Sequence, residues 1–150
     1  MKFSLSNDPI DSVALLQSVA DDRAGACVSF EGRVRNHHQG KLVSALEYEA
    51  ADILAISEGR KILTEAIERF SLYHAAAAHR LGKLSIGEVA VVVHVTSAHR
   101  KEAFLACEWV IDEIKSRVPI WKKEYYHDEA PQWVLCSRCG EAHSHHHDSA

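Results

Sequence analysis

Four segments of the 150-residue chain combine basic, thiol or imidazole side chains at spacings that could do chemistry. The first, FEGRVRNHH at residues 30–38, carries two arginines two positions apart at the end of a predicted strand. Strand alternation places Arg33 and Arg35 on one face, where their planar guanidinium groups suit phosphate or carboxylate oxygens. A solvated strand end is the alternative interpretation of this pair.

The second segment, TSAHR at residues 96–100, lies where an almost continuously apolar strand leads into the most regular helical pattern of the chain. A helix N-terminus has free N–H groups and a partial positive charge, so cations such as His99 and Arg100 are unfavourable there unless an anion binds. The pattern therefore indicates an anion site, although long side chains that point into water are the alternative.

The third segment contains three lysines. Lys115 lies near the end of the same predicted helix, and Lys122 and Lys123 follow on the next predicted strand. Lysines are favourable at a helix C-terminus, so their presence requires no function. Pro119 and Trp121 could exclude water from a lysine and lower its pKa toward that of a useful acid or base. Strand alternation lets only one of Lys122 and Lys123 face such a site, and the sequence leaves that choice open.

The fourth segment is a polar tail, residues 136–150, in which CSRCG precedes four histidines. C-x-x-C with nearby histidines has the spacing of zinc ligands, but a second, regularly spaced pair is absent. We therefore predict no dedicated metal site and keep a non-enzymatic metal-binding or metal-delivery domain as the alternative function. The isolated strand histidines, His74, His79 and His94, are interpreted as structural.

The elements that must position these segments follow from the apolar periodicity. Helical spacing covers residues 10–21, 52–70 and 97–118, with Asp8 and Ser97 as the expected N-caps of the first and third helices. Strand patterns cover residues 25–34, 42–50, 74–81, 88–96, 120–126 and 132–135. The apolar face of the third helix is expected to contain Ala103, Phe104, Cys107, Val110, Ile111, Ile114 and Val118.

Three features decide the predicted architecture. Residues 88–96 are almost continuously apolar and must form a central strand, whereas residues 25–34 and 42–50 are expected to pair across a long polar loop. Gly82 and Gly87 are expected to bracket a turn. Because helices and strands do not alternate strictly, we predict an α+β fold with helices packed on one face of a largely antiparallel sheet.

Composition limits the possible functions. A chain of 150 residues with 47% hydrophobic residues forms one domain, expected at residues 1–135 with 136–150 as the tail. A formal charge of −4 argues against a nucleic-acid binder. There is no apolar run of about 18 residues and no secretory signal pattern, so no membrane association is expected and a cytoplasmic location is predicted. Common nucleotide-binding and hydrolase motifs are also absent.

Three motifs together carry a resemblance to a known family: FEGRVRNH, VTSAHR and IKSRVPIWKKE, in this order and spacing. They resemble the catalytic (large) subunit family of molybdopterin synthase over about residues 25–134. The resemblance implies an α/β hammerhead-type fold and a sulfurtransferase that uses no cofactor. It also implies a homodimer within a heterotetramer, whose other subunits are small ubiquitin-like sulfur carriers with a C-terminal Gly-Gly. The implied reaction, part of molybdenum cofactor biosynthesis, moves sulfur from the thiocarboxylated carrier to cyclic pyranopterin monophosphate and gives molybdopterin.

The same resemblance assigns roles to eight residues. Lys115 and Lys122 match the active-site lysines, with Lys115 expected to be essential as a nucleophile or as an acid or base. The substrate-binding positions are Phe30, Arg33, Val34, Arg35, His99 and Arg100. The tail departs from the family pattern, and Arg138 is only a shifted match, so neither is included in the site.

The length of the third helix adds a geometric expectation. Arg100 and Lys115 are 15 residues apart, which corresponds to about 22 Å along a helix axis. One small ligand cannot bridge that distance within a chain. We therefore predict a composite site in which the His99–Arg100 segment of one protomer meets Arg35, Lys115 and Lys122 of its two-fold partner.

Overall fold

The computed structural model describes residues 2–127 and 129–135. The helices in this part of the chain are α1 (Ser12–Gln17), α2 (Asp52–Phe70) and α3 (Arg100–Arg117). The strands are β1 (Lys2–Ser6), β2 (Ala26–Arg33), β3 (His37–His38), β4 (Lys41–Ala50), β5 (Leu72–Arg80), β6 (Gly82–Ser85), β7 (Val89–Ser97), β8 (Ile120–Tyr126) and β9 (Gln132–Leu135).

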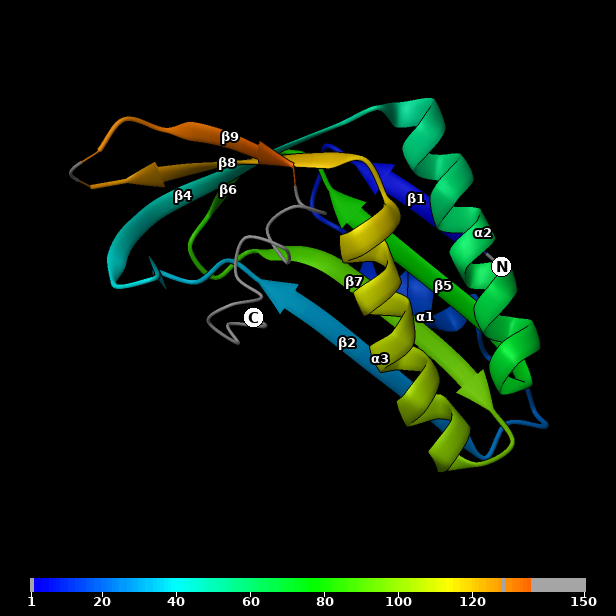
Figure 1. Ribbon diagram of the computed structural model, residues 1–150. Helices are drawn as coiled ribbons and strands as arrows, with labels where there is room; N and C mark the ends of the chain where they lie inside the picture. The colour runs from blue at the N-terminus through cyan, green and yellow to red at the C-terminus, as the bar shows by residue number, and fades with distance from the viewer. Residues whose placement is uncertain (1, 128, 136–150) are drawn as a thin grey trace.

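The strands form two sheets that diverge from one another (Figure 1). The first has the order β1-β5-β7-β2, in which β1 and β5 are parallel and the other neighbours are antiparallel. The second has the order β3-β4-β8-β9, with β6 paired to β4, and all its described pairs are antiparallel. The predicted α+β class with a largely antiparallel sheet is confirmed, and so is the central position of residues 88–96 in β7.

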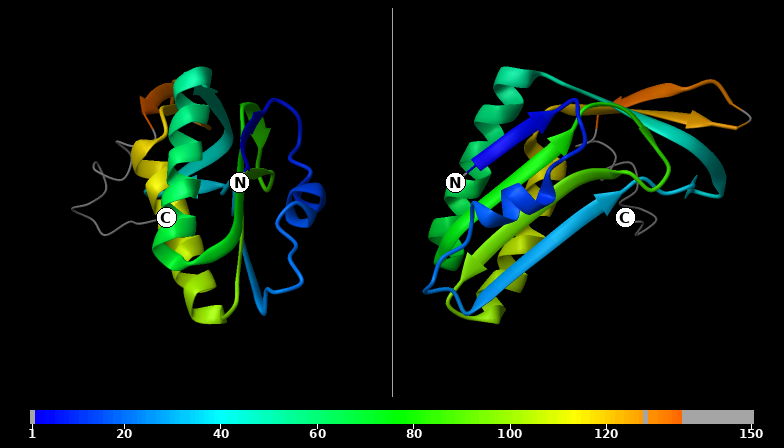
Figure 2. Two further views of the ribbon diagram at one scale, coloured as in Figure 1. Left: turned by 90° about the vertical axis from the view of Figure 1, so that its right-hand side faces the viewer. Right: turned by 180° about the vertical axis from the view of Figure 1, so that it is seen from behind.

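Both faces of the first sheet are covered by helices (Figure 2). The long helices α2 and α3 pack on one face, and the short α1 lies on the other, where Leu15 and Val19 contact Ala76, Ala78 and Val92. The prediction that all helices share one face is therefore wrong for α1. The reason is that β5 and β7 are buried on both faces, and side chains such as Ala76 and Val92 need an apolar cover of their own.

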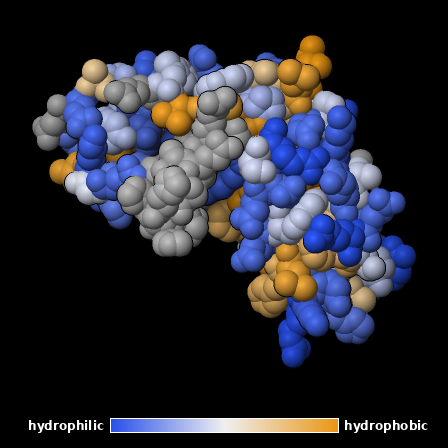
Figure 3. Space-filling view, in the orientation of Figure 1, coloured by the Kyte–Doolittle hydropathy of each residue, from blue (hydrophilic) through white to orange (hydrophobic). Residues whose placement is uncertain are grey.

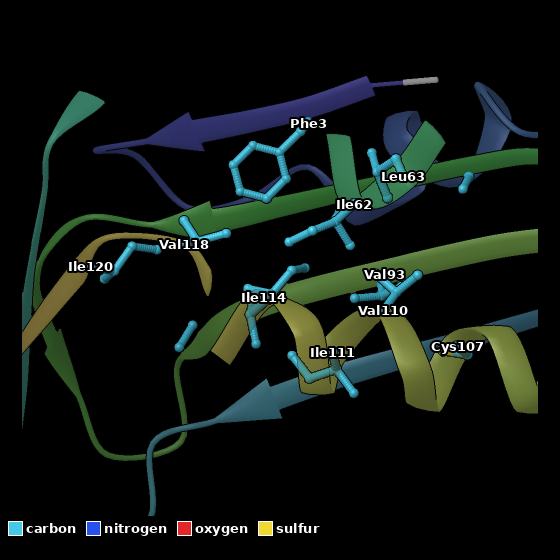
Figure 4. Close-up of a cluster of buried hydrophobic side chains, with 14 of the residues drawn as sticks. Phe3, Ile62, Leu63, Val93, Cys107, Val110, Ile111, Ile114, Val118 and Ile120 are labelled. Atoms are coloured by element: carbon cyan, nitrogen blue, oxygen red, sulfur yellow. The ribbon is translucent and has the colours of Figure 1, made fainter. Parts of the chain in front are cut away.

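The main core lies between the first sheet and the helices α2 and α3 (Figure 4). Ile62 and Leu63 of α2 and Val110 of α3 are fully buried there. A Cβ atom at Gly59 would collide with the ring of Phe3, so this glycine, which lowers helix propensity, allows β1 to approach α2 closely. Helix propensity alone would make Gly59 a weak point of α2, whereas the packing requires a glycine there.

The outer surface of the helical layer is mostly hydrophilic (Figure 3). Hydrophobic patches remain near the start of α2 and on the first half of α3, where Ile53 is 86% and Phe104 is 61% exposed. The prediction that Phe104 belongs to the buried face of α3 is wrong. The buried face consists instead of Ala103, Ala106, Cys107, Val110, Ile111 and Ile114.

Two predicted connections differ from the structure. Residues 25–34 and 42–50 do not pair, because β2 pairs with β7 in the first sheet and β4 pairs with β6 and β8 in the second. The predicted turn at residues 82–87 contains β6, which extends the second sheet. In both cases pairing with a strand distant in sequence replaces the local arrangement.

Both predicted N-caps are also displaced. Asp8 lies in a turn in which its N–H donates to the Ser6 hydroxyl at 3.1 Å, and α1 is capped instead by Asp11, whose carboxylate accepts from the Ala14 N–H at 3.0 Å. Ser97 is the last residue of β7, and its hydroxyl donates to the His99 carbonyl at 2.6 Å. The N-cap of α3 is therefore His99.

Candidate active site

The two candidate lysines lie where α3 leads into β8. Lys115 is exposed in the last turn of α3, and Pro119 separates this helix from β8. Val118 and Ile120 anchor the junction in the core, because they are 0% and 2% exposed (Figure 4). Lys122 shares the inward face of β8 with Ile120, since they are two residues apart.

Lys122 is largely enclosed and is paired with a carboxylate. Its ammonium lies 3.7 Å from Oε2 of Glu124, and the two side chains are 17% and 11% exposed. Lys123 is on the opposite face of β8, with its ammonium over the rings of Tyr125 and Trp133. The register of β8 thus puts Lys122, and not Lys123, on the face that also carries Glu124.

A second contact fixes the carboxylate. The hydroxyl of Tyr126 donates to Oε1 of Glu124 at 2.9 Å, so both carboxylate oxygens have polar neighbours. Glu124 and Tyr126 were not predicted as site residues from the sequence, although the alternating pattern Lys122-x-Glu124-x-Tyr126 puts all three on one face. Trp121 does not shield Lys122 as suggested, because it lies on the other face of β8 and is 37% exposed.

The charge of Lys115 acts on a buried histidine, His79. His79 is near the end of β5 and 7% exposed, and burial lowers its pKa from 6.5 to about 4, with the Lys115 charge acting in the same direction. Burial raises the pKa of Asp112, and the nearby Glu108 adds to this, whereas the Lys115 charge opposes both. The neighbourhood of Lys115 therefore contains a neutral imidazole and a carboxyl group on its own helix.

The arginine segment continues from the edge strand β2. The ladder between β2 and β7 has an irregularity between Gly32 and Arg33, after which Val34 is 3% exposed and both neighbouring arginines are exposed. The backbone of Val34 is held by hydrogen bonds to residues 87 and 88, of 2.8 and 3.0 Å. One arginine, Arg33, is paired with Glu31 at 2.9 Å, and Phe30 is 37% exposed.

Within one chain, the His99–Arg100 segment is remote from the other candidates. It begins α3, next to Ser97, which pairs with Ala26 at the first residue of β2. Arg33 pairs with Val89 seven residues further along β2, which corresponds to about 23 Å. Since α3 folds back over β7, its C-terminal end with Lys115 lies at the Arg33 end of the sheet (Figure 1).

Other predicted features concern metals and membranes. Among residues 2–127 and 129–135, no group of three or more His, Cys, Asp or Glu side chains is arranged to hold a metal ion. The Cys136 and Cys139 pair and the histidines of the tail lie outside the described residues, so the interpretation of the tail stays a prediction. None of the helices in the described part of the chain is long and apolar enough to cross a membrane.

Taken together, the fold and the site define a two-sheet α+β protein with a lysine pair at the junction of its last helix and its second sheet. The family model described as "MoaE protein" matches residues 5–117. This chain belongs to the MoaE protein family. The family resemblance read from the three sequence motifs is confirmed.

Relatives agree with this assignment. A protein of Pyrococcus abyssi named molybdopterin synthase catalytic subunit is 42% identical over 138 residues, which cover 89% of this chain and 90% of that protein. A crystal structure of molybdopterin synthase from Staphylococcus aureus has a TM-score of 0.82 and 35% identity, and covers 87% of this chain and 94% of that one. The fold that the family resemblance implied is thus confirmed.

A more distant structure shares the fold alone. It comes from Helicobacter pylori, is 22% identical with a TM-score of 0.70, and covers 89% of this chain and 88% of that one. That structure is described as a protein–protein complex of subunits 1 and 2 of molybdopterin-converting factor.

Proposed function

We propose that the chain performs the sulfur transfer of a molybdopterin synthase catalytic subunit in molybdenum cofactor biosynthesis. The observation that carries the proposal is the enclosed Lys122–Glu124 pair directly after the helix end that bears Lys115, in a member of the MoaE family. The substrate is cyclic pyranopterin monophosphate, and each sulfur comes from the thiocarboxylated C-terminus of a small carrier protein. Such chemistry requires fixed cations for anionic groups and a side chain that can handle protons or act as a nucleophile.

Lys115 and Lys122 are the proposed catalytic residues. Each transfer replaces a carbon–oxygen bond of the substrate with a carbon–sulfur bond, and the displaced oxygen leaves as water or stays on the phosphate. The carbon–sulfur bond of the carrier is broken by water, whose oxygen returns the carrier C-terminus to a carboxylate. Glu124 holds Lys122 at a fixed place, whereas Lys115 is exposed at the surface that the carrier C-terminus approaches. Lys115 acts either as a nucleophile or as an acid or base.

The remaining candidates form the proposed substrate-binding set. Arg35, His99 and Arg100 hold the phosphate, and Phe30 and Arg33 line the site. Val34 contributes by anchoring the two neighbouring arginines, because its side chain belongs to the core and its backbone is bonded to residues 87 and 88. Since His99 and Arg100 are at the far end of α3 from Lys115, the set is complete only when the two-fold partner supplies one part of it.

The proposed assembly is a homodimer within a heterotetramer. Its other member is a small ubiquitin-like carrier that ends in Gly-Gly. Support comes from the Helicobacter protein of the same fold, which is described as a complex of two subunits. No nucleic-acid partner is proposed for a chain of net charge −4.

The function is tested by mixing the protein with a thiocarboxylated carrier and cyclic pyranopterin monophosphate, and by measuring dithiolene product. We expect product from the native chain and a loss of at least about 100-fold for Lys115→Ala. Lys61→Ala, which changes a lysine that is 66% exposed on α2, is the matched control and should retain full activity. Absence of product with a carrier that is competent in a known synthase would refute the proposal.

The alternative function, a metal-binding or metal-delivery domain, rests on the Cys- and His-rich tail. Truncation after Leu135 separates the two functions. We expect the truncated chain to retain sulfur transfer. The alternative would be favoured if the full chain shows no synthase activity and truncation only removes bound metal.

A further inference from the structure

Arg117, the last residue of α3, binds carboxylates of two helices. Its Nη1 and Nη2 donate to the two carboxylate oxygens of Glu65 at 3.1 and 2.7 Å, which makes a bidentate pair. Its Nε donates to Glu58 at 2.9 Å, and Nη1 also donates to Glu113 at 3.1 Å. Glu58 and Glu65 belong to α2, whereas Glu113 belongs to α3 itself. The guanidinium group thus ties the end of α3 to the neighbouring helix.

This ionic cluster is only partly open to solvent. The side chain of Arg117 is 26% exposed, and the side chains of its three acidic partners range from 28% to 48% exposed. Partial burial reduces the screening that makes most surface ion pairs weak, and a bidentate guanidinium has one defined orientation. The hydrogen bond from Arg117 also lowers the pKa of Glu65, so this carboxylate stays charged at neutral pH. The contacts can therefore fix the position of α3 relative to α2.

The cluster lies in the helical turn that carries Lys115. The final turn of a helix tends to fray, because its last carbonyl groups have no partner within the helix. Lys115 is two residues before Arg117, which at about 100° per residue puts the two side chains on nearly opposite sides of α3. Ile114, which is 3% exposed, holds this turn against the core, and Arg117 holds it against α2 (Figure 1). With these two sides fixed, the direction of the side that carries Lys115 is fixed as well.

The same turn leads directly into the strand that carries Lys122. The N–H of Val118 donates to the Ile114 carbonyl at 3.1 Å, and the N–H of Ala51 donates to the Pro119 carbonyl at 3.2 Å. Because Ala51 is the N-cap of α2, this helix contacts the junction a second time, just before β8 begins. The relative position of the two lysines therefore depends on how α2 and α3 are joined.

We propose that Arg117 is a positioning residue for Lys115, because its contacts with α2 hold the last turn of α3 and so fix the direction in which Lys115 points. This inference rests on the proposed function, since it deepens the role of Lys115 in that reaction. The lysine side chain is long and flexible, so a fixed backbone turn limits the positions that its ammonium can reach. A displacement of about 1 Å at a reacting group can lower a rate about 100-fold, so loosening of this turn should be visible in kcat.

Four variants separate this role from a general effect on stability. Arg117→Lys keeps the positive charge but loses the planar fork that binds two carboxylates. The double Gln variant, Glu58→Gln with Glu65→Gln, keeps Arg117 and weakens its contacts with α2. Glu113→Gln is the matched control, because it changes the contact within α3 and leaves both contacts with α2. Val19→Ala is a second control, which removes a buried side chain on the opposite face of the first sheet.

The first measurement needs neither substrate nor carrier. Exchange of the backbone amide hydrogens of residues 114–118 is followed by nuclear magnetic resonance in the folded protein. We expect exchange to be about tenfold faster in Arg117→Lys and in the double Gln variant, because the last turn opens more often. Glu113→Gln and Val19→Ala should keep the native exchange rates, since opening of a helix end is a local event.

The second measurement is sulfur transfer, at a temperature well below the thermal unfolding of every variant. We expect kcat to fall about tenfold in Arg117→Lys and in the double Gln variant, with an unchanged KM for the phosphate substrate. Both controls should keep the native kcat. An unchanged kcat in Arg117→Lys, or an equal fall in either control, would overturn the proposal. If Arg117→Lys does not fold, the double Gln variant decides.

A combined variant shows whether Arg117 acts through Lys115. Product is accumulated over hours with the Lys115→Ala chain, with and without Arg117→Lys. A residue that only positions Lys115 has no effect once Lys115 is absent, so the two residual rates should be equal. A further fall of about tenfold in the combined variant would mean that Arg117 acts on the site independently of Lys115, and would overturn the proposal.

The proposed function and the role of Arg117 fail separately. If the native chain gives no product but amide exchange responds as expected, the proposed function is wrong, and Arg117 still holds the turn that carries Lys115. If the native chain gives product and kcat does not respond to Arg117→Lys, the inference about Arg117 is wrong and the proposed function stands.

Discussion

The separation of Arg100 and Lys115 leads to a quantitative prediction for mixed dimers. Both residues are on the unbroken helix α3, about 22 Å apart along its axis. If one site draws on both, it must take them from different protomers. We expect Arg100→Ala and Lys115→Ala homodimers each to be almost inactive in sulfur transfer.

Mixing the two variants should restore a defined fraction of the activity. Equal amounts of the two chains, unfolded and refolded together, give about half heterodimers. Each heterodimer has one site with both native residues and one site with neither, so about a quarter of all sites are intact. The expected rate is therefore about 25% of the native rate, measured as dithiolene product per protomer with saturating carrier.

The same experiment can also refute the prediction of a composite site. A rate that stays at the level of the single variants, although mass spectrometry of the native dimers shows that heterodimers have formed, would mean that each site uses residues of one chain only. A mixture of Lys115→Ala with Lys122→Ala is the control, because both residues are proposed to belong to the same half-site. Each heterodimer site would then lack one lysine, and this mixture should remain inactive.

Three further predictions concern stability and the lysine site. Glu124→Gln should lower the free energy of unfolding by about 1–3 kcal/mol and reduce kcat, because it removes the charge that faces Lys122; chemical denaturation and steady-state kinetics test this. Gly59→Ala should cost about 1–3 kcal/mol in thermal unfolding, and Phe3→Leu in the same chain should recover part of the loss, whereas additive losses would contradict the packing argument. Burial lowers the pKa of His79 from the ordinary 6.5 to about 4 in the folded protein, so between these pH values the unfolded chain binds a proton that the folded chain does not. The free energy of unfolding should therefore fall by about 3 kcal/mol from pH 6.5 to pH 4, and by less in His79→Gln, as measured by chemical denaturation at each pH.

The elements that could be predicted are those with a strong local apolar pattern. The continuous apolar run of β7 and the 3.6-residue periodicity of α3 identify these elements without knowledge of their partners. The two sheets could not be predicted, because pairing is a long-range choice. For example, Lys2 of β1 pairs with Ala76 of β5, and nothing in the short KFSLS segment specifies that partner.

The site could be predicted in its residue types but not in its geometry. Basic side chains at element ends made Lys115 and the pair of Lys122 and Lys123 candidates. The resemblance selected Lys115 and Lys122, which stay a prediction, and the order of the motifs gave the family. Glu124 was overlooked because a glutamate on a strand is usually solvated, and only the register of β8 shows that it is 8% exposed. His79 was interpreted as structural, and its contact with the ring of Tyr48 could not be predicted because the two residues are distant in sequence.

The central claim, that this chain moves sulfur from a carrier protein to a pterin phosphate, is tested most directly with an isotope. A carrier whose C-terminal thiocarboxylate contains sulfur-34 is mixed with the protein and unlabelled cyclic pyranopterin monophosphate, and the product is analysed by mass spectrometry. We predict a dithiolene product in which both sulfur atoms are labelled. Product without label, or no product while Lys115 and Lys122 are intact and the carrier is competent, would contradict the account.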